Sequence, residues 1–262
     1  MASLREILSG RARRGRAAFI PYLTAGDPTL RWTRRFSAAL GRAGADLIEL
    51  GVPFSDPIAD GPVNQRAAER SLKAGTTLAK ILDFAAAGGT GGIPAMLFTY
   101  LNPLLRMGLA DFARRARRAG IAGVLTVDLP PEEAAQYRRA LAGSGLETAF
   151  LAAPTTSDER LKAIGRASTG FVYYVSRLGV TGARKDLAAG LAGDVARVRR
   201  LTRRPVAVGF GISTPAQAAA VGRVADGVVV GSALVRLAEE HRPEEAERRI
   251  ERLAGSIARG LA

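Results

Sequence analysis

The chain contains an acidic, turn-rich stretch that reads Leu47-Ile48-Glu49-Leu50-Gly51-Val52-Pro53-Phe54-Ser55-Asp56-Pro57-Ile58-Ala59-Asp60-Gly61-Pro62. Its first residues predict a short apolar strand, in which Glu49 lies on the same face as Leu47 because alternate residues of a strand share a face. Glu49 therefore points into a packed interior or into the cleft at the end of the strand. An ionised carboxylate in either place needs a partner or a shifted pKa. Glu49 is thus a candidate catalytic group, and a strand-end salt bridge with an arginine is the alternative.

Short apolar runs alternate with amphipathic stretches outward from this strand, which is typical of repeated βα units around a parallel sheet. Eight strands are expected, at Ala18 to Leu23, Asp46 to Leu50, Ala95 to Tyr100, Gly123 to Val127, Thr148 to Leu151, Gly170 to Val175, Val206 to Gly209 and Gly227 to Val230. Helices are expected between them, for example at Leu109 to Ala119, Glu132 to Leu141, Asp158 to Ala167 and Pro215 to Val221, and at the two ends, Ser3 to Leu8 and Glu244 to Leu261.

This count favours one α/β domain over residues 1–262, a (β/α)8 TIM barrel with extra N-terminal and C-terminal helices. No linker rich in proline or serine divides the 262 residues. The competing doubly wound sheet would require a glycine-rich dinucleotide turn after the first strand, and the residues from Tyr22 to Pro28 do not form one.

The composition excludes several classes of site and location. The chain has no cysteine and one histidine, His241, so thiolate sites are absent and a histidine-based metal site is not expected. No apolar window is long enough to span a bilayer, and the N-terminus does not resemble a signal peptide. We therefore expect a cytoplasmic protein without a membrane partner.

A formal net charge of +14 raises the possibility of a nucleic-acid partner. Nearly all of this charge is arginine that shares helical stretches with alanine and leucine, as in the cluster from Arg114 to Arg118. No aromatic residues are interleaved with the clusters, so we interpret them as solvated helix faces and expect no nucleic-acid partner.

Paired glycine turns follow the seventh and eighth predicted strands. They are Gly209-Phe210-Gly211-Ile212-Ser213 and Gly231-Ser232. Loops in these positions of a barrel commonly bind a phosphate through backbone N–H groups and a helix N-terminus. The sequence therefore predicts a phosphorylated substrate, with plain strand-to-helix turns as the alternative.

The chain resembles the tryptophan synthase α-subunit family over nearly its whole length. The resemblance rests on the segments Phe19 to Pro28, Leu47 to Gly61, Tyr100 to Pro103, Asp128 to Pro130, Tyr173 to Gly182, Gly209 to Ser213 and Gly231-Ser232. It implies reversible cleavage of indole-3-glycerol phosphate to indole and glyceraldehyde 3-phosphate. It also implies that indole passes to a β subunit in an α2β2 heterotetramer, that pyridoxal phosphate is bound by the β subunit, and that this chain holds no cofactor.

The residue inventory agrees with acid–base chemistry for such a cleavage. A Schiff-base aldolase needs a lysine in the barrel mouth, and the four lysines are Lys73, Lys80 and Lys162 in helical stretches and Lys185 in a loop. The resemblance assigns the proton transfers to Glu49 and the binding of the indole N–H to Asp60. Two carboxylates in unlike environments suit these roles if the pKa of Glu49 is raised and Asp60 stays ionised.

The resemblance also implies roles for other positions. Tyr173 lies beside the catalytic carboxylate, and its alternative is a plain core aromatic. The remaining expected contacts are Tyr22, Asn64, Phe98, Tyr100, Leu125, Thr181 and Phe210 for substrate, Gly182, Gly211, Gly231 and Ser232 for phosphate, and Pro53, Asp56, Asn102 and Pro103 for the β subunit. The loop from Leu178 to Leu191, which carries Thr181, resembles the mobile lid of the family.

Two of these positions depart from the family pattern. Asn64 stands where an aliphatic residue usually faces the indole, and Phe98 replaces a leucine or methionine. A buried amide costs about 1–3 kcal/mol unless it finds a hydrogen-bond partner. These changes leave two alternatives open within the fold, a stand-alone lyase that releases free indole and an inactive barrel kept as a regulatory partner.

Overall fold

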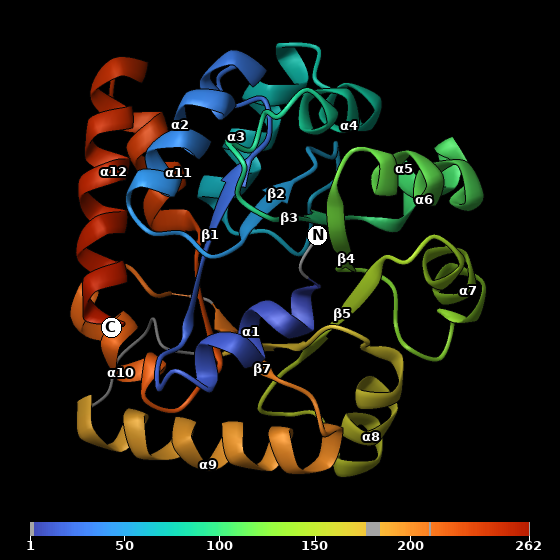
Figure 1. Ribbon diagram of the computed structural model, residues 1–262, viewed down its shortest axis with the longest axis vertical. Helices are drawn as coiled ribbons and strands as arrows, with labels where there is room; N and C mark the ends of the chain where they lie inside the picture. The colour runs from blue at the N-terminus through green and yellow to red at the C-terminus, as the bar shows by residue number, and fades with distance from the viewer. Residues whose placement is uncertain (1–2, 177–183, 210, 262) are drawn as a thin grey trace.

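Eight parallel strands close into a barrel in the order β1-β2-β3-β4-β5-β6-β7-β8. The computed structural model describes residues 3–176, 184–209 and 211–261 (Figure 1). The strands are β1 (Ala18–Thr24), β2 (Ile48–Gly51), β3 (Ala95–Thr99), β4 (Ile121–Thr126), β5 (Glu147–Ala152), β6 (Val172–Val175), β7 (Val206–Gly209) and β8 (Gly227–Val230). The predicted (β/α)8 barrel is therefore confirmed.

Helices surround the barrel on all sides in Figure 1. They are α1 (Leu4–Ala12), α2 (Leu30–Arg42), α3 (Pro62–Lys73), α4 (Leu78–Ala86), α5 (Leu101–Met107), α6 (Leu109–Arg118), α7 (Ala135–Gly143), α8 (Asp158–Ala167), α9 (Arg184–Thr202), α10 (Pro215–Gly222), α11 (Ser232–Glu240) and α12 (Pro243–Gly260). Side-chain caps mark several of their starts, for example Thr214, which accepts from the backbone N–H of Gln217 at α10.

Most predicted boundaries agree with the structure within two residues, and three predictions need correction. Helix α1 ends at Ala12 instead of Leu8, because Arg11 and Ala12 favour a helix. Helix α7 begins at Ala135 instead of Glu132, because the two prolines at 130 and 131 open a turn whose carbonyls accept from the following N–H groups. The predicted loop from Leu178 to Leu191 is helical from Arg184 onward, because alanine, leucine, lysine and arginine favour a helix more than the single Gly190 disfavours it. Thr181, Gly182 and Phe210 lie outside the described residues.

The strands present two different faces. Ile48 and Leu50 of β2 belong to the apolar layer between the strands and the outer helices. Leu47 belongs to the separate cluster inside the barrel, with side chains such as Met96 and Ala207. Since Glu49 shares its face with Leu47, the alternation places its carboxyl group inside the barrel, as predicted.

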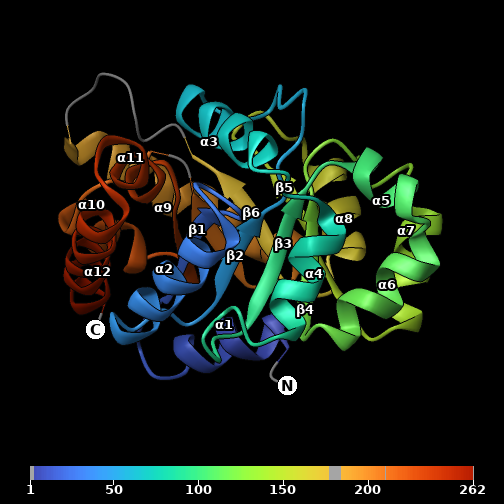
Figure 2. The ribbon, with the colours of Figure 1, turned by 90° about the horizontal axis from the view of Figure 1, so that it is seen from above.

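The two ends of the barrel are covered differently. Helix α1 closes the N-terminal end, where the fully buried Leu4 and Leu8 join the interior cluster. Figure 2 shows α1 at one end of the barrel and α3 at the opposite end. The functional site must therefore lie at the end near α3, where the carboxyl ends of the strands and their loops meet.

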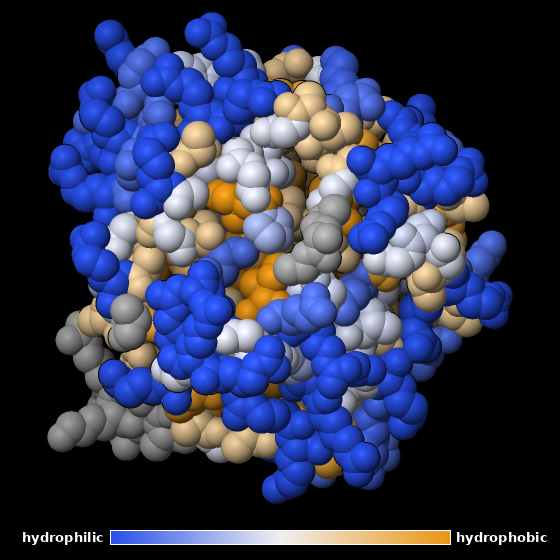
Figure 3. Space-filling view, viewed as in Figure 1, coloured by the Kyte–Doolittle hydropathy of each residue, from blue (hydrophilic) through white to orange (hydrophobic). Residues whose placement is uncertain are grey.

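Arginine side chains extend into solvent from the outer helices. On α6 the side chains of Arg114 and Arg115 are 60% and 35% exposed and pair with Asp111 and Asp83. Figure 3 shows mainly hydrophilic side chains over the outer helices on that face. The expected solvated helix faces are present, and no helix in the described part of the chain has an apolar stretch long enough to cross a membrane.

Candidate active site

A cavity of about 260 Å³ opens at the carboxyl end of the barrel. Its walls come from β1, β2, β3, β6 and β8 and from the loops and helix starts that follow them. The lining residues are Tyr22, Glu49, Asp60, Gly61, Pro62, Val63, Asn64, Phe98, Tyr173, Gly211, Ile212, Val229, Gly231, Ser232 and Arg236. The cavity thus joins both candidate carboxylates to the glycine turns after β7 and β8.

Glu49 is held deep in this cavity by the pairing of its strand. It lies opposite Tyr22 of β1 and Met96 of β3, and it is only 1% exposed. Its Oε1 atom is buried without a hydrogen-bond partner in the described structure. Burial, followed by the nearby charge of Asp60, raises the pKa of Glu49 to about 8. A carboxylic acid with such a pKa can give up and regain a proton near neutral pH, which is what a general acid–base group requires.

Asp60 lies at the rim of the same cavity, in the loop between β2 and α3. The Tyr100 hydroxyl donates to its Oδ2 at 2.9 Å and accepts from the backbone N–H of Ala59 at 3.0 Å. Phe54 stacks on Tyr100 with ring centroids 4.9 Å apart. Burial raises the pKa of Asp60, while hydrogen bonds from Tyr100 and Asn64 oppose that rise. The loop therefore holds Asp60 in a fixed, hydrogen-bonded position, in contrast to Glu49.

Two tyrosine rings line the cavity because two glycines leave room for them. A Cβ atom at Gly51 would collide with the ring and hydroxyl of Tyr22, and one at Gly209 would collide with those of Tyr173. Tyr22 also meets Phe98 edge to face, with ring centroids 5.6 Å apart. The aromatic walls of the cavity consequently depend on glycines in the neighbouring strands.

The opposite side of the cavity is formed by the glycine turns. Gly211 has a φ of +77°, which favours glycine, and Gly231 precedes Ser232, the first residue of α11. The N-terminus of α11 therefore opens onto the cavity, where backbone N–H groups suit an anion. Arg236 lies one turn further along α11 and also lines the cavity. Ser213 does not line it, since its hydroxyl donates to Gln217.

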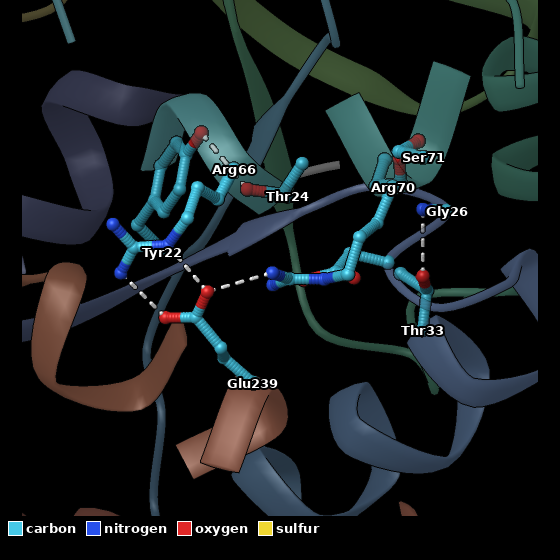
Figure 4. A network of polar contacts seen from close by, with 10 residues as sticks. Tyr22, Thr24, Gly26, Thr33, Arg66, Arg70, Ser71 and Glu239 are labelled. Carbon is cyan, nitrogen blue, oxygen red and sulfur yellow. Dashed lines mark hydrogen bonds and ion pairs between the residues drawn. The ribbon is translucent and has the colours of Figure 1, made fainter. Parts of the chain in front are cut away.

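A network of ion pairs ties α3 to α11 behind the cavity. Arg70 of α3 pairs with Asp27 at 2.8 Å and with Glu239 of α11 at 2.9 Å. Arg66 also donates to both carboxylate oxygens of Glu239, at 2.6 and 2.8 Å (Figure 4). These two arginines lower the pKa of Glu239 to about 2. The helix that carries Ser232 is thereby fixed to the helix that follows Asp60.

The structure brings most of the predicted site residues together. Those that line one cavity are Tyr22, Glu49, Asp60, Asn64, Phe98, Tyr173, Gly211, Gly231 and Ser232. Tyr100 reaches the site only through its bond to Asp60, and Leu125 is fully buried in the cluster inside the barrel. Neither is among the lining residues.

The predicted partner surface lies beside the Asp60 loop. Asp56 and Asn102 are exposed, Pro103 is half-buried and Pro53 is buried. The apolar side chains of Ile58 and Leu105 are 88% and 52% exposed on the adjoining loop and helix α5, where they would suit a partner. The two elements are joined by the bond between Ala59 and Tyr100.

Several lining residues were not identified from the sequence. Among them are Val63, Ile212, Val229 and Arg236. Arg236 could have been found, because it lies four residues after Ser232 and the two positions share one face of a helix. No cluster of three or more acidic, histidine or cysteine side chains suited to a metal occurs in the described ranges.

Comparisons with known proteins give one consistent result. The family model described as "Tryptophan synthase alpha chain" matches residues 8–261. The tryptophan synthase alpha chain of Solibacter usitatus is 53% identical over 95% of this chain and 94% of its own length. That of Geobacter sulfurreducens is 48% identical over 94% of each chain.

Solved structures give the same result. A crystal structure of tryptophan synthase from M. tuberculosis in an aminoacrylate-bound form matches with a TM-score of 0.89 and 38% identity over 100% of both chains. Tryptophan synthase subunit alpha from Legionella pneumophila matches with a TM-score of 0.90 and 35% identity, covering 100% of this chain and 98% of that one.

Proposed function

This chain belongs to the tryptophan synthase alpha chain family, and from that premise we propose how its own residues cleave indole-3-glycerol phosphate to indole and glyceraldehyde 3-phosphate. The observation that carries the proposal is the buried carboxyl of Glu49, with a pKa of about 8, on a cavity shared with Asp60 and Ser232. The cavity thus offers a proton donor, a fixed carboxylate and an anion site along one wall-lined space.

Glu49 performs the proton transfers. With a pKa of about 8 its carboxyl group is mainly protonated at neutral pH, so it can deliver a proton to C3 of the indole ring. The resulting carboxylate then takes the proton from the glycerol hydroxyl. The bond between indole C3 and the glycerol carbon breaks, its electron pair restores the aromatic ring, and the hydroxyl carbon becomes the aldehyde. Tyr173 lines the cavity beside this step.

Asp60 holds the indole N–H and stabilises the positive charge that forms on the ring nitrogen after C3 is protonated. Its hydrogen bond from Tyr100 favours the ionised form that this role requires. The aromatic rings of Tyr22 and Phe98 provide apolar walls for the indole. Asn64 lines the same cavity, and its side chain lowers the pKa of Asp60.

The phosphate binds at the start of α11, where Gly211, Gly231 and Ser232 line the cavity. The family resemblance adds Thr181 and Phe210 to the substrate contacts and Gly182 to the phosphate contacts. The same resemblance makes Leu125 a wall of the indole pocket.

The partner of this chain is a tryptophan synthase β subunit, in an α2β2 complex in which the β subunit binds pyridoxal phosphate and this chain binds no cofactor. The exposed Ile58 and Leu105 beside Asp56 and Asn102 support a docking surface there, with Pro53 and Pro103 shaping it. We place the complex in the cytoplasm. Residues 1–262 act as one domain, in keeping with the closed barrel.

The residue roles are tested by spectrophotometric assay of indole-3-glycerol phosphate consumption. Glu49→Gln should fold and lose cleavage by more than about 100-fold, and Asp60→Asn should lose most of it. Glu69→Gln, the same chemical change at an exposed position of α3, is the matched control. Near-normal turnover in either site variant would contradict the proposed mechanism.

The second arm of the assay adds a β subunit. Strong activation of cleavage on addition supports the synthase component. Equal activity with and without the β subunit, together with release of free indole, would instead favour the stand-alone lyase.

A further inference from the structure

Arg236 is the one cationic side chain among the described residues that line the cavity. The cavity also contains the Asp60 carboxylate, and Glu49 becomes a second carboxylate once it has given up its proton, so an anionic substrate meets negative charge there. A phosphate monoester carries a charge of about −1.5 to −2 at pH 7. Its entry therefore needs a compensating positive charge in the same cavity.

The position of Arg236 on α11 directs it to the phosphate side. It lies four residues after Ser232, so both side chains share one face of the helix. Ser232, Gly231 and Gly211 line the cavity together with Arg236. Backbone N–H groups and a hydroxyl in this place can orient a phosphate, but none of them carries a full charge.

Arg236 also remains available for a ligand, because it forms an ion pair with neither Glu239 nor Glu240, the two acidic residues three and four positions further along its helix, in the described structure. Glu239 lies three residues further along α11, and Arg66 and Arg70 of α3 hold both of its carboxylate oxygens, as Figure 4 shows. Within the described residues no carboxylate comes within ion-pairing distance of Arg236, and its side chain is exposed.

We propose that Arg236 is a substrate-binding residue that contacts the phosphate group and supplies the positive charge of this site. The inference rests on the proposed function and deepens it, since it names a further binding residue for the same substrate. The guanidinium fork can place two parallel N–H groups on two phosphate oxygens. The ion pairs of Arg66 and Arg70 with Glu239 remove one competing carboxylate from the guanidinium group of Arg236.

The direct test is equilibrium binding of glycerol 3-phosphate, measured by titration calorimetry, to the wild type and to Arg236→Met. Methionine keeps an unbranched aliphatic side chain and lacks the charged guanidinium group. The dissociation constant should rise about tenfold, the effect of losing one charged hydrogen bond. The affinity for indole, which has no phosphate, should stay within about twofold. Arg252→Met, at an exposed position of α12 outside the cavity lining, is the matched control and should bind both ligands as the wild type does.

Kinetics provide a second measurement. Arg236→Met should raise the KM for indole-3-glycerol phosphate about tenfold and change kcat by less than about threefold, since the phosphate is remote from the bond that breaks. Arg236→Lys, which restores a charge without the fork, should recover part of the lost affinity.

The inference is overturned if Arg236→Met binds glycerol 3-phosphate within twofold of the wild type, or if its indole affinity falls by the same factor. The same measurements distinguish a failure of this inference from a failure of the proposed function. A wild-type protein that binds glycerol 3-phosphate but does not cleave indole-3-glycerol phosphate would reject the proposed reaction and leave the phosphate site standing.

Discussion

Replacing Glu49 by glutamine exchanges a group that can ionise inside the barrel for one that cannot. Glu49 is 1% exposed and its Oε1 has no hydrogen-bond partner among the described residues. Its pKa is about 8 in the folded protein against an ordinary value of 4.5. Between these two values the unfolded chain has released a proton that the folded chain still holds. The wild type therefore loses stability as the pH rises from 4.5 through 8.

The size of this loss follows from the pKa difference. One pKa unit corresponds to about 1.4 kcal/mol, so the burial of Glu49 lowers the free energy of unfolding by about 3 kcal/mol at pH 7 and about 5 kcal/mol at pH 9. Glu49→Gln does not carry this pH-dependent cost. The variant should match the wild type near pH 4 and become progressively more stable than it toward alkaline pH.

Urea unfolding at a series of pH values, followed by circular dichroism, measures this difference. Glu69→Gln on the exposed face of α3 should show a difference from the wild type that does not change with pH. A constant difference between Glu49→Gln and the wild type from pH 4 to pH 9 would refute the reasoning, because it would mean that Glu49 titrates alike in both states.

Three further perturbations probe the surroundings of the site. Tyr100→Phe removes a hydrogen bond that opposes the rise in the pKa of Asp60. The acidic limb of the pH profile of kcat should therefore move to higher pH. An acidic limb that does not move would show that this bond does not act on the ionised carboxylate. Gly209→Ala places a methyl group against Tyr173, so kcat should fall at least about tenfold. Urea unfolding should show a free energy of unfolding that is lower by about 1–3 kcal/mol. An unchanged kcat would mean that the ring of Tyr173 can shift freely. Arg70→Met leaves the buried Asp27 carboxylate without its ion-pair partner, which should cost about 3 kcal/mol in urea unfolding with little dependence on salt. A loss below about 1 kcal/mol would mean that Asp27 tolerates the change.

The fold could be predicted from the sequence where local signals and tertiary structure agree. Strands β7 and β8 begin and end at the predicted residues because glycine or proline stands at their boundaries. The inward direction of Glu49 followed from the alternation of side chains in β2 alone. The predicted end of α1, the start of α7 and the extent of α9 were wrong, because helix-forming residues extended α1 and α9 and a proline turn delayed the start of α7.

The site was predictable only in part. Motifs placed Glu49, Asp60 and Ser232 at the ends of strands, and barrel geometry then brings those ends together. The network around Arg70 was not predictable, because its partners lie 43 and 169 residues away in the sequence. Asn64 was expected to need a hydrogen-bond partner. Its side chain lowers the pKa of Asp60, and its Oδ1 is buried without a hydrogen-bond partner in the described structure.

Helix α1 has a consequence for how this chain is made. It leaves the ribosome before every strand it will contact, and its partners come from distant parts of the sequence. A Cβ atom at Gly170 would meet Leu4, and one at Gly227, at the start of the last strand, would come within 3.3 Å of Leu8. The side chain of Leu8 therefore reaches its full burial only after β8, the last strand of the barrel, has been synthesised.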